Sequence, residues 1–239
     1  MDERVARQLL EKNRQDYNKI VEKFSNTRKF SWREFEDFLQ YVNEGDTVLD
    51  AGCGNGRLIE LLSKKNIEYT GIDYSNKLID VARKQHPGHN FTVGDITTLP
   101  FSNNKFNVIF CIATLHHIPG QKLRQQTIQG ISRILKKNGY LIMTNWNLWQ
   151  KMWWPMLIQN ALQKITGQSQ LDWQDILKPW KNEQGEIITK RYIHSFRPGE
   201  LKKLLNKNGL IILQQYYTKK GLPANWLTGY NLVTIARKA

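Results

Sequence analysis

The sequence has little of what membrane proteins and disulfide-stabilised proteins need. Its two cysteines, Cys53 and Cys111, are too few for a disulfide framework or a thiolate metal site. No run of about eighteen apolar residues exists, so no membrane-spanning segment is expected. The first residues are charged and lack an apolar core, so no secretory signal is expected. These absences predict a cytoplasmic protein with no membrane partner and no metal site.

Acidic residues are scarce as well, and they are unevenly distributed. The net charge is +14, and residues 191–239 carry nine basic side chains but one acidic one. A one-sided basic surface attracts phosphate groups, so it favours a nucleic-acid partner over a charge that serves only solubility. Hydrophobic residues make up 40% of the chain, which is typical of a packed globular domain.

Short apolar strands alternate with helical segments along the chain. We expect strands at 47–50, 69–73, 91–95, 106–112 and 140–145, and helices at 2–24, 31–43, 58–65, 75–85 and 121–137. The Trp-rich residues 147–190 break this rhythm and are predicted to form a helical insertion. A helix at 198–207 and strands at 210–218 and 231–237 close the chain. The alternation predicts an α/β fold with a seven-stranded, mostly parallel sheet that is covered on both faces.

The most specific motif is the run VLDAGCGNGR at residues 48–57, where a strand leads into a helix. Gly52, Gly54 and Gly56 allow the backbone to turn tightly and to approach a ligand closely. A dinucleotide fingerprint would place its third glycine at position 57, which is Arg57. The G-x-G-x-G spacing therefore disfavours NAD and suits a cofactor without a pyrophosphate.

Further candidate ligands follow the next strands. Asp73 ends the second strand about 20 residues past the glycines, where a carboxylate can accept both hydroxyls of a ribose. Asp95 follows the third strand, and the fourth leads into His116 and His117. The carboxyl ends of strands are where open α/β sheets bind ligands. A single aspartate there is usually a turn or a helix cap, but several in this order favour a cofactor site.

The run from Asp50 to Gly56 resembles motif I of class I S-adenosylmethionine-dependent methyltransferases. The resemblance implies a Rossmann-like fold with S-adenosylmethionine as the cofactor. The length of 239 residues predicts one domain, which we divide into an N-terminal helical cap (1–45), a cofactor-binding core (46–146), the Trp-rich insertion (147–190) and a basic C-terminal part (191–239). The residues that the resemblance places at the cofactor are Asp50, Gly52, Gly54, Gly56, Asp73, Tyr74, Asp95, Ile96 and Ile112.

Four other runs resemble a narrower group, the tRNA wobble-uridine carboxymethyl methyltransferases and their bacterial relatives. They are residues 17–28, which end in FSNTR and are followed by Trp32, IATLHH (112–117), Asn145-Trp146, and RYIHSF (191–196) with Gly199-Glu200-Leu201 after it. The resemblance implies that the protein esterifies a carboxymethyl group on the wobble uridine of tRNA. Eukaryotic members of this group act with a small activating protein, so such a protein is a second candidate partner.

A carboxylate acceptor needs no general base, because with a pKa of about 4 it is ionised at pH 7. It does need cations and donors to hold it, and the candidates are Arg28, His116, Arg191 and His194. We expect the two arginines to clamp the carboxylate at the mouth of the pocket with His194 nearby. Of the adjacent histidines, we expect His116 to face the pocket and His117 to pack behind it.

Two other functions compete with this one. A small-molecule methyltransferase would act on an acid or a phenol, and the basic C-terminal part disfavours it. An RNA-binding protein that has lost turnover would explain the charge, but the intact glycine motif with Asp73 and Asp95 disfavours that interpretation. The tryptophans of the insertion could stack on unpaired bases, although burial against the domain is the commoner use of such rings.

Overall fold

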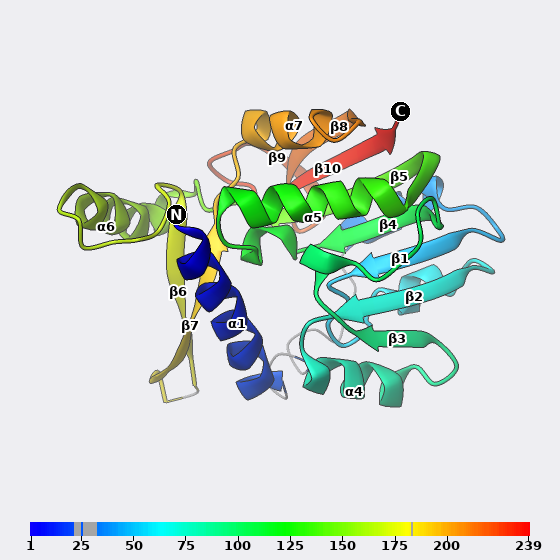
Figure 1. Ribbon diagram of the computed structural model, residues 1–239, viewed down its shortest axis with the longest axis horizontal. Helices are drawn as coiled ribbons and strands as arrows, with labels where there is room; N and C mark the ends of the chain where they lie inside the picture. The colour runs from blue at the N-terminus through cyan, green and yellow to red at the C-terminus, as the bar shows by residue number, and fades with distance from the viewer. Residues whose placement is uncertain (22–24, 26–32, 183) are drawn as a thin grey trace.

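The chain folds around an eight-stranded sheet with the strand order β3-β2-β1-β4-β5-β10-β8-β9 (Figure 1). The computed structural model describes residues 1–21, 25, 33–182 and 184–239. Strands β1 to β5 pair in parallel, and β10 runs antiparallel between β5 and β8. The bounds of the strands are β1 Thr47–Ala51, β2 Glu68–Asp73, β3 Asn90–Val93, β4 Phe106–Ile112, β5 Leu135–Trp146, β8 Leu210–Lys219, β9 Leu222–Ala224 and β10 Asn231–Lys238.

Helices cover both faces of this sheet. Helices α5 (Gln121–Ile134) and α7 (Pro198–Asn206) share one hydrophobic core. The 3-10 helix η1 (Arg33–Tyr41) and helices α3 (Ile59–Leu62) and α4 (Asn76–Gln85) share the other. Strand β4 shows why both faces are apolar, since Ile109 and Cys111 enter the first core while Val108 and Phe110 enter the second. Alternate side chains of a strand point to opposite faces, so a strand that is buried on both sides has apolar residues at successive positions.

The predicted Rossmann-like α/β fold is confirmed, with one addition to the sheet. The expected seven strands are present, and β9 is a further three-residue strand at the edge beside β8. It contains Pro223, which lacks a backbone donor and is tolerated on an edge strand. So short a strand leaves no periodic pattern in the sequence. In the described part of the chain, no helix is long and apolar enough to cross a membrane.

The prediction of a helix over 121–137 is wrong at its end. Helix α5 ends at Ile134, and Leu135 already pairs with Phe106 as the first residue of β5. The register of this pairing then shifts before Tyr140 pairs with Val108. A Cβ on Gly139 would lie 2.7 Å from the carbonyl oxygen of Asn107. This glycine therefore permits close approach of two strands, instead of ending a helix as the local sequence suggests.

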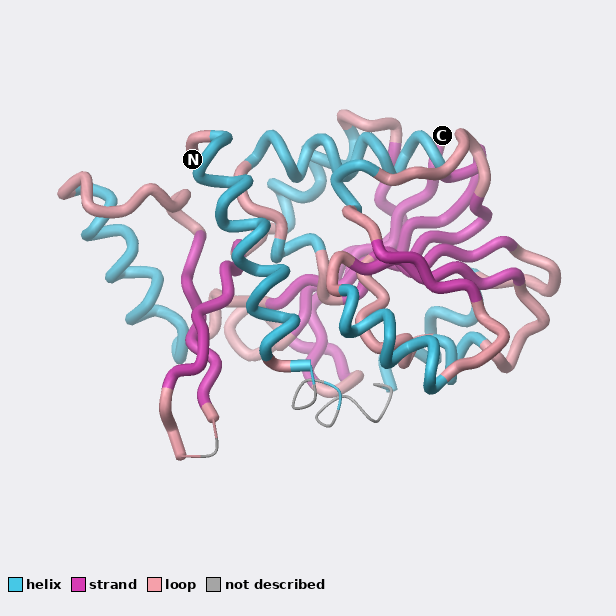
Figure 2. Tube along the Cα trace, turned by 60° about the horizontal axis from the view of Figure 1, so that its bottom comes forward, coloured by secondary structure: helices cyan, strands magenta, loops and turns pink. Residues whose placement is uncertain are grey.

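The prediction of a helical insertion is also wrong in part. Residues 147–190 do contain η4 (Lys151–Trp153) and α6 (Trp154–Ile165). They also contain β6 (Asp175–Lys181), which pairs antiparallel with β7 (Ile187–His194) in a separate two-stranded sheet. This hairpin lies beside helix α1 (Glu3–Lys19), away from the main sheet (Figures 1 and 2). A lone hairpin is marginally stable, so its formation depends on packing against α1, which lies far away in sequence.

Candidate active site

The glycine turn after β1 is held against two neighbouring segments. Its first amides, those of Gly52 and Cys53, donate to the carbonyl oxygen of Ile72 at 2.7 and 3.1 Å. Gly52 has a φ of +84°, and a Cβ built on it would lie 2.3 Å from the side chain of Thr114. Only glycine meets both requirements, since other residues are strained at this φ and would collide with the turn after β4. The motif thus brings the ends of β1 and β4 together.

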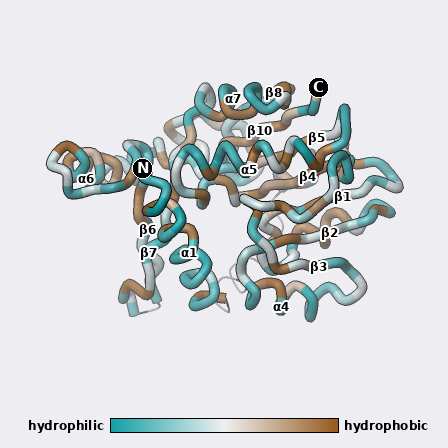
Figure 3. Tube along the Cα trace, viewed as in Figure 1, coloured by the Kyte–Doolittle hydropathy of each residue, from teal (hydrophilic) through white to brown (hydrophobic). Residues whose placement is uncertain are grey.

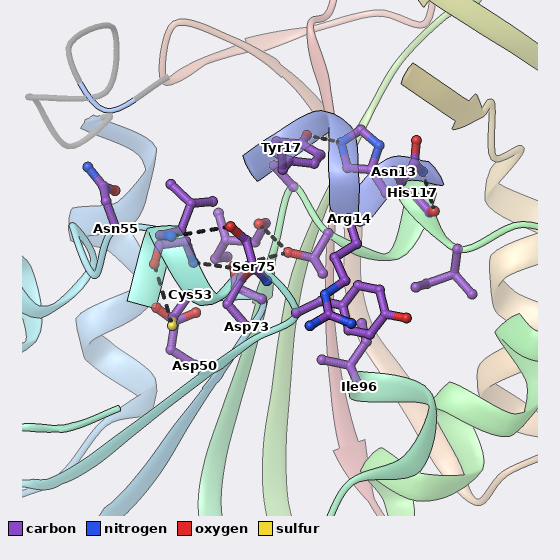
Figure 4. Close-up of a pocket in the computed structure, with 18 of the residues that line it drawn as sticks. Asn13, Arg14, Tyr17, Asp50, Cys53, Asn55, Asp73, Ser75, Ile96 and His117 are labelled. Carbon is purple, nitrogen blue, oxygen red and sulfur yellow. Dashed lines mark hydrogen bonds between the residues drawn. The ribbon is translucent and has the colours of Figure 1, made fainter. Parts of the chain in front are cut away.

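Three carboxylates line the pocket above this turn. Asp50, Asp73 and Asp95 come from β1, from the end of β2 and from the turn after β3. The oxygens of Asp73 accept hydrogen bonds from the amides of Gly54 (2.9 Å) and Ser75 (2.8 Å) (Figure 4). Among the described residues, none of the three carboxylates forms an ion pair with a basic side chain. The pocket therefore suits a ligand with positive charge.

Burial makes these carboxylates costly to ionise. It raises the pKa of Asp50 to about 7, while a hydrogen bond from the Tyr69 hydroxyl at 3.1 Å opposes the rise. It also raises the pKa of Asp73, against hydrogen bonds from the backbone amides of Ser75, Gly54 and Tyr74, which favour the ionised form. A positive group bound beside them would compensate for the lost hydration and lower both pKa values. A cationic ligand would therefore stabilise the ionised carboxylates, whereas an anionic ligand would be repelled by them.

Helix α1 closes the pocket from the side opposite the strand ends. Asn13, Arg14 and Tyr17 project from it into the pocket (Figure 4). The amide nitrogen of Asn13 donates to the carbonyl oxygen of His117 at 3.1 Å. The guanidinium of Arg14 lies 4.9 Å from the centre of the Tyr74 ring. Tyr17 lies in the first run that carries the family resemblance, but no role was predicted for it, and no motif pointed to Asn13 or Arg14, because contacts across about a hundred residues leave no local pattern.

These features fit S-adenosylmethionine. Because Gly52 has no side chain, a ligand can approach the backbone closely there. The pocket carboxylates form no ion pair among the described residues, so they suit the positively charged sulfonium and ammonium groups of this cofactor. Asp50 and Asp73 would hold its charged and hydroxyl groups, and Ile96 with Tyr74 offers apolar surface for the base. A dinucleotide fits poorly, because its pyrophosphate would meet buried carboxylates.

The comparison with protein-family models agrees with this geometry. Residues 42–191 match the model of a methyltransferase domain. The chain belongs to the class I S-adenosylmethionine-dependent methyltransferases. In this methyltransferase, the pocket lining contains Asp50, Gly52, Gly54, Asp73, Tyr74, Asp95, Ile96 and Ile112 from the predicted cofactor site. Gly56 does not line the pocket, because its φ of +80° serves the turn beneath, where a Cβ would lie 2.9 Å from the Phe91 ring.

Relatives of the methyltransferase include enzymes named for tRNA. The tRNA (carboxymethyluridine(34)-5-O)-methyltransferase of Schizosaccharomyces pombe is 30% identical over 230 residues, which cover 89% of this chain and 92% of the relative. A Xenopus tropicalis enzyme with the same activity in its name is 26% identical, and the match covers 88% of this chain but 39% of that longer protein.

Solved structures give the same fold. An S-adenosylmethionine-dependent methyltransferase from Methanosarcina mazei superposes with a TM-score of 0.69 at 26% identity, covering 84% of this chain and 96% of that one. A complex between the Haloferax volcanii Trm112 methyltransferase activator and a methyltransferase matches with a TM-score of 0.63 at 18% identity, covering 92% and 96%. At that identity the likeness is one of fold.

The expected division of roles between the two histidines is reversed. His117 lines the pocket, and its Nε2 lies 2.8 Å from the Tyr17 hydroxyl (Figure 4). His117 Nδ1 lies 2.9 Å from the carbonyl oxygen of Tyr192, so Nδ1 carries the proton and Nε2 accepts from Tyr17. His116 is fully buried and stacks on Trp146 at 5.1 Å. Burial, followed by the neighbouring His117 and Arg191, lowers the pKa of His116 far below its usual value, so it is neutral.

The other predicted acceptor residues occupy different places. Arg28 lies outside the described residues. Arg191 is buried just behind the pocket wall, and its Nη1 donates to the Tyr17 hydroxyl at 3.3 Å. His194 is absent from the pocket lining, because its ring is held between Asp175 (2.7 Å) and Glu200 (2.9 Å). The expectation that His194 lies at the mouth is therefore wrong, whereas the catalytic role of Arg191 stays a prediction.

Proposed function

We propose that the protein methylates a carboxymethyl group on the wobble uridine of tRNA, forming a methyl ester. The observation that carries this proposal is the similarity to the Schizosaccharomyces pombe enzyme, which is named for that reaction and matches along nearly its whole length. The basic C-terminal part, with nine basic side chains and one acidic one in residues 191–239, supports a polyanionic substrate.

The charges around the pocket support a carboxylate acceptor. The acids stand at the strand ends, whereas the buried cation Arg191 lies behind Tyr17 on the opposite side. When bound, S-adenosylmethionine supplies a methyl group on a positively charged sulfur, and its transfer to a carboxylate moves no proton. The chain must therefore orient the acceptor and exclude water, and it needs no general base. Tyr17, His117 and Trp146 form the wall where an acceptor would enter.

The direct test uses tritiated S-adenosylmethionine and tRNA from cells that lack the wobble methyl ester. We expect label in the tRNA, and mild alkali should release it as volatile methanol, because esters hydrolyse where methylated bases and riboses do not. Label that resists alkali would contradict the ester. Label in small acids or phenols, with none in tRNA, would favour the small-molecule alternative.

A small activating protein is a second proposed partner. Its support is the Haloferax volcanii complex, in which a protein of this fold binds the Trm112 activator. The tRNA assay should therefore be run on the chain alone and with the activator of its own host. A higher methylation rate only with the activator is the expected result, and equal rates would remove the partner from the proposal.

A further inference from the structure

Two cations face each other across the β6–β7 hairpin. Lys178 on β6 pairs directly with Arg191 on β7 in the antiparallel register. Side chains of directly opposed residues stand on the same face of a sheet, about 5 Å apart at Cβ, and like charges in this position are destabilising. The chain thus maintains a repulsive pair on a hairpin that has little stability of its own.

Arg191 makes this arrangement more costly, because it is 2% exposed. Among the described residues, no carboxylate forms an ion pair with it, and its Nε has no hydrogen-bond partner. Its Nη1 donates to the neutral Tyr17 hydroxyl, which brings no compensating charge. Buried charges are normally paired, so the position of Arg191 indicates a site that an anion would complete.

Aromatic rings hold both cations in place. The guanidinium of Arg191 lies 4.3 Å from the centre of the Trp180 ring and 5.4 Å from that of Trp146. The ammonium of Lys178 lies 4.5 Å from the rings of Trp146 and of Trp153. Ring faces attract a cation but accept no strong hydrogen bonds, so the Nε–H of Arg191 remains for an acceptor. The tryptophans therefore orient the cations, and this is a use that the sequence did not reveal.

The pair adjoins the active-site pocket. Trp146, over which both cations lie, lines that pocket, and so does Tyr17 beneath Arg191. His116 stacks on the same Trp146 ring, and its Nε2 is buried without a partner among the described residues. Its Nδ1 accepts from the Trp146 amide, so a neutral His116 carries its proton on Nε2 and can donate it. Two cations and a neutral donor therefore gather around one aromatic wall.

We propose that Lys178 and Arg191 form a carboxylate-binding pair that holds the acid group of the methyl acceptor at this wall. The planar guanidinium supplies a fork of donors and the ammonium supplies a point charge, and together they bind one anion from two strands. A carboxylate is favoured over a backbone phosphate, because the pair adjoins the pocket of the transferred methyl group through Trp146. This inference rests on the proposed function.

The test compares two anticodon stem-loop RNAs that differ only in the acceptor. One carries 5-carboxymethyluridine at the wobble position, and the other carries the neutral carboxamide of the same shape. Binding is measured by fluorescence anisotropy with S-adenosylhomocysteine present. We expect the wild type to prefer the acid by about tenfold, and Lys178→Met and Arg191→Gln to reduce this preference nearly to one. Lys190→Met is the matched control, since it removes an exposed charge from the same hairpin.

Three outcomes would overturn the proposal that Lys178 and Arg191 bind the carboxylate. The first is that both variants retain the preference for the acid, and the second is that both RNAs lose affinity equally, as expected for phosphate contacts. The third is that Lys190→Met reduces the preference as much as Lys178→Met does. Calorimetry with S-adenosylhomocysteine checks folding, and half-buried Lys178 provides the variant that is safer for stability.

A second measurement separates failure of the pair from failure of the proposed function. Tryptophan fluorescence is followed while free 5-carboxymethyluridine or its carboxamide is added. Preference for the acid in the wild type, lost in Lys178→Met, supports the pair even if no tRNA is methylated. Methylation of tRNA that is unchanged in both variants would overturn the pair and leave the proposed function standing.

Discussion

The substitution Asp50→Asn tests whether the buried carboxylate of Asp50 lowers the free energy of unfolding when it is ionised. The amide would keep the size of the side chain and an oxygen for the Tyr69 hydroxyl, but it cannot ionise. The folded protein raises the pKa of Asp50 from 3.8 to about 7. Between these values the folded state binds more protons than the unfolded state, so the unfolding free energy of the wild type falls as pH rises. At 1.36 kcal/mol per pKa unit, the full cost is about 4 kcal/mol and is complete above pH 7.

The expected result is a pH-dependent gain in the variant. From pH 5 to pH 8, the unfolding free energy of Asp50→Asn should rise relative to wild type by about 2–3 kcal/mol, which is the part of the linkage in that window. Urea denaturation followed by tryptophan fluorescence measures it without ligand. Asp80→Asn is the control, because that carboxylate is 60% exposed in a surface pair with Arg83. Parallel pH profiles for wild type and Asp50→Asn would refute the reasoning, whatever their vertical offset.

Three further predictions concern the ligands. Gly52→Ala should abolish cofactor binding in calorimetry, since its Cβ would lie 2.3 Å from Thr114, and retained affinity would contradict the described turn. Asp73→Ala should weaken S-adenosylhomocysteine by about 1.5–3 kcal/mol, because charge-assisted hydrogen bonds are lost, and unchanged calorimetric affinity would remove Asp73 from the site. Neutralising the C-terminal lysines should flatten the salt dependence of tRNA affinity, whereas an unchanged slope would place the RNA surface elsewhere. Those lysines are Lys202, Lys203, Lys207, Lys219 and Lys220.

A different surface shows apolar side chains that no described residue covers. Ile158 and Leu162 of α6 are 57% and 59% exposed, and this helix stands apart from the main sheet, where Figure 3 shows hydrophobic segments among hydrophilic ones. Surface patches of this kind mark contacts with other molecules in many proteins.

Much of the sheet could be predicted because each of its main strands leaves a local pattern of apolar residues in the sequence. Strand β4 was expected at 106–112 and has those bounds, since a continuous apolar run suits a strand buried on both faces. Helix α7 begins at Pro198, whose fixed φ favours the first turn. The end of α5 was mispredicted, because cations followed by a glycine are typical of a helix end. The same pattern is also compatible with the bulged start of β5 that the structure shows.

The roles of the histidines on the acceptor side of the pocket could not be predicted, for a different reason. His116 and His117 are neighbours in sequence, and which one faces the pocket depends on Tyr17 and on the Tyr192 carbonyl, which lie on α1 and β7. His194 looked available, but Asp175 and Glu200 hold both of its ring nitrogens. Side-chain direction at such positions is decided by partners far away along the chain.

The alternation of strands and helices, the glycine turn and the acids at the strand ends could all be read from the amino-acid sequence. These features depend on backbone conformation and on periodicity over a few residues, so the local chain carries them. Tertiary packing, by contrast, closes the pocket with α1 and sets Lys178 opposite Arg191 on the β6–β7 hairpin. Those contacts join segments more than a hundred residues apart or depend on a strand register, and packing chooses among the arrangements that the local sequence allows.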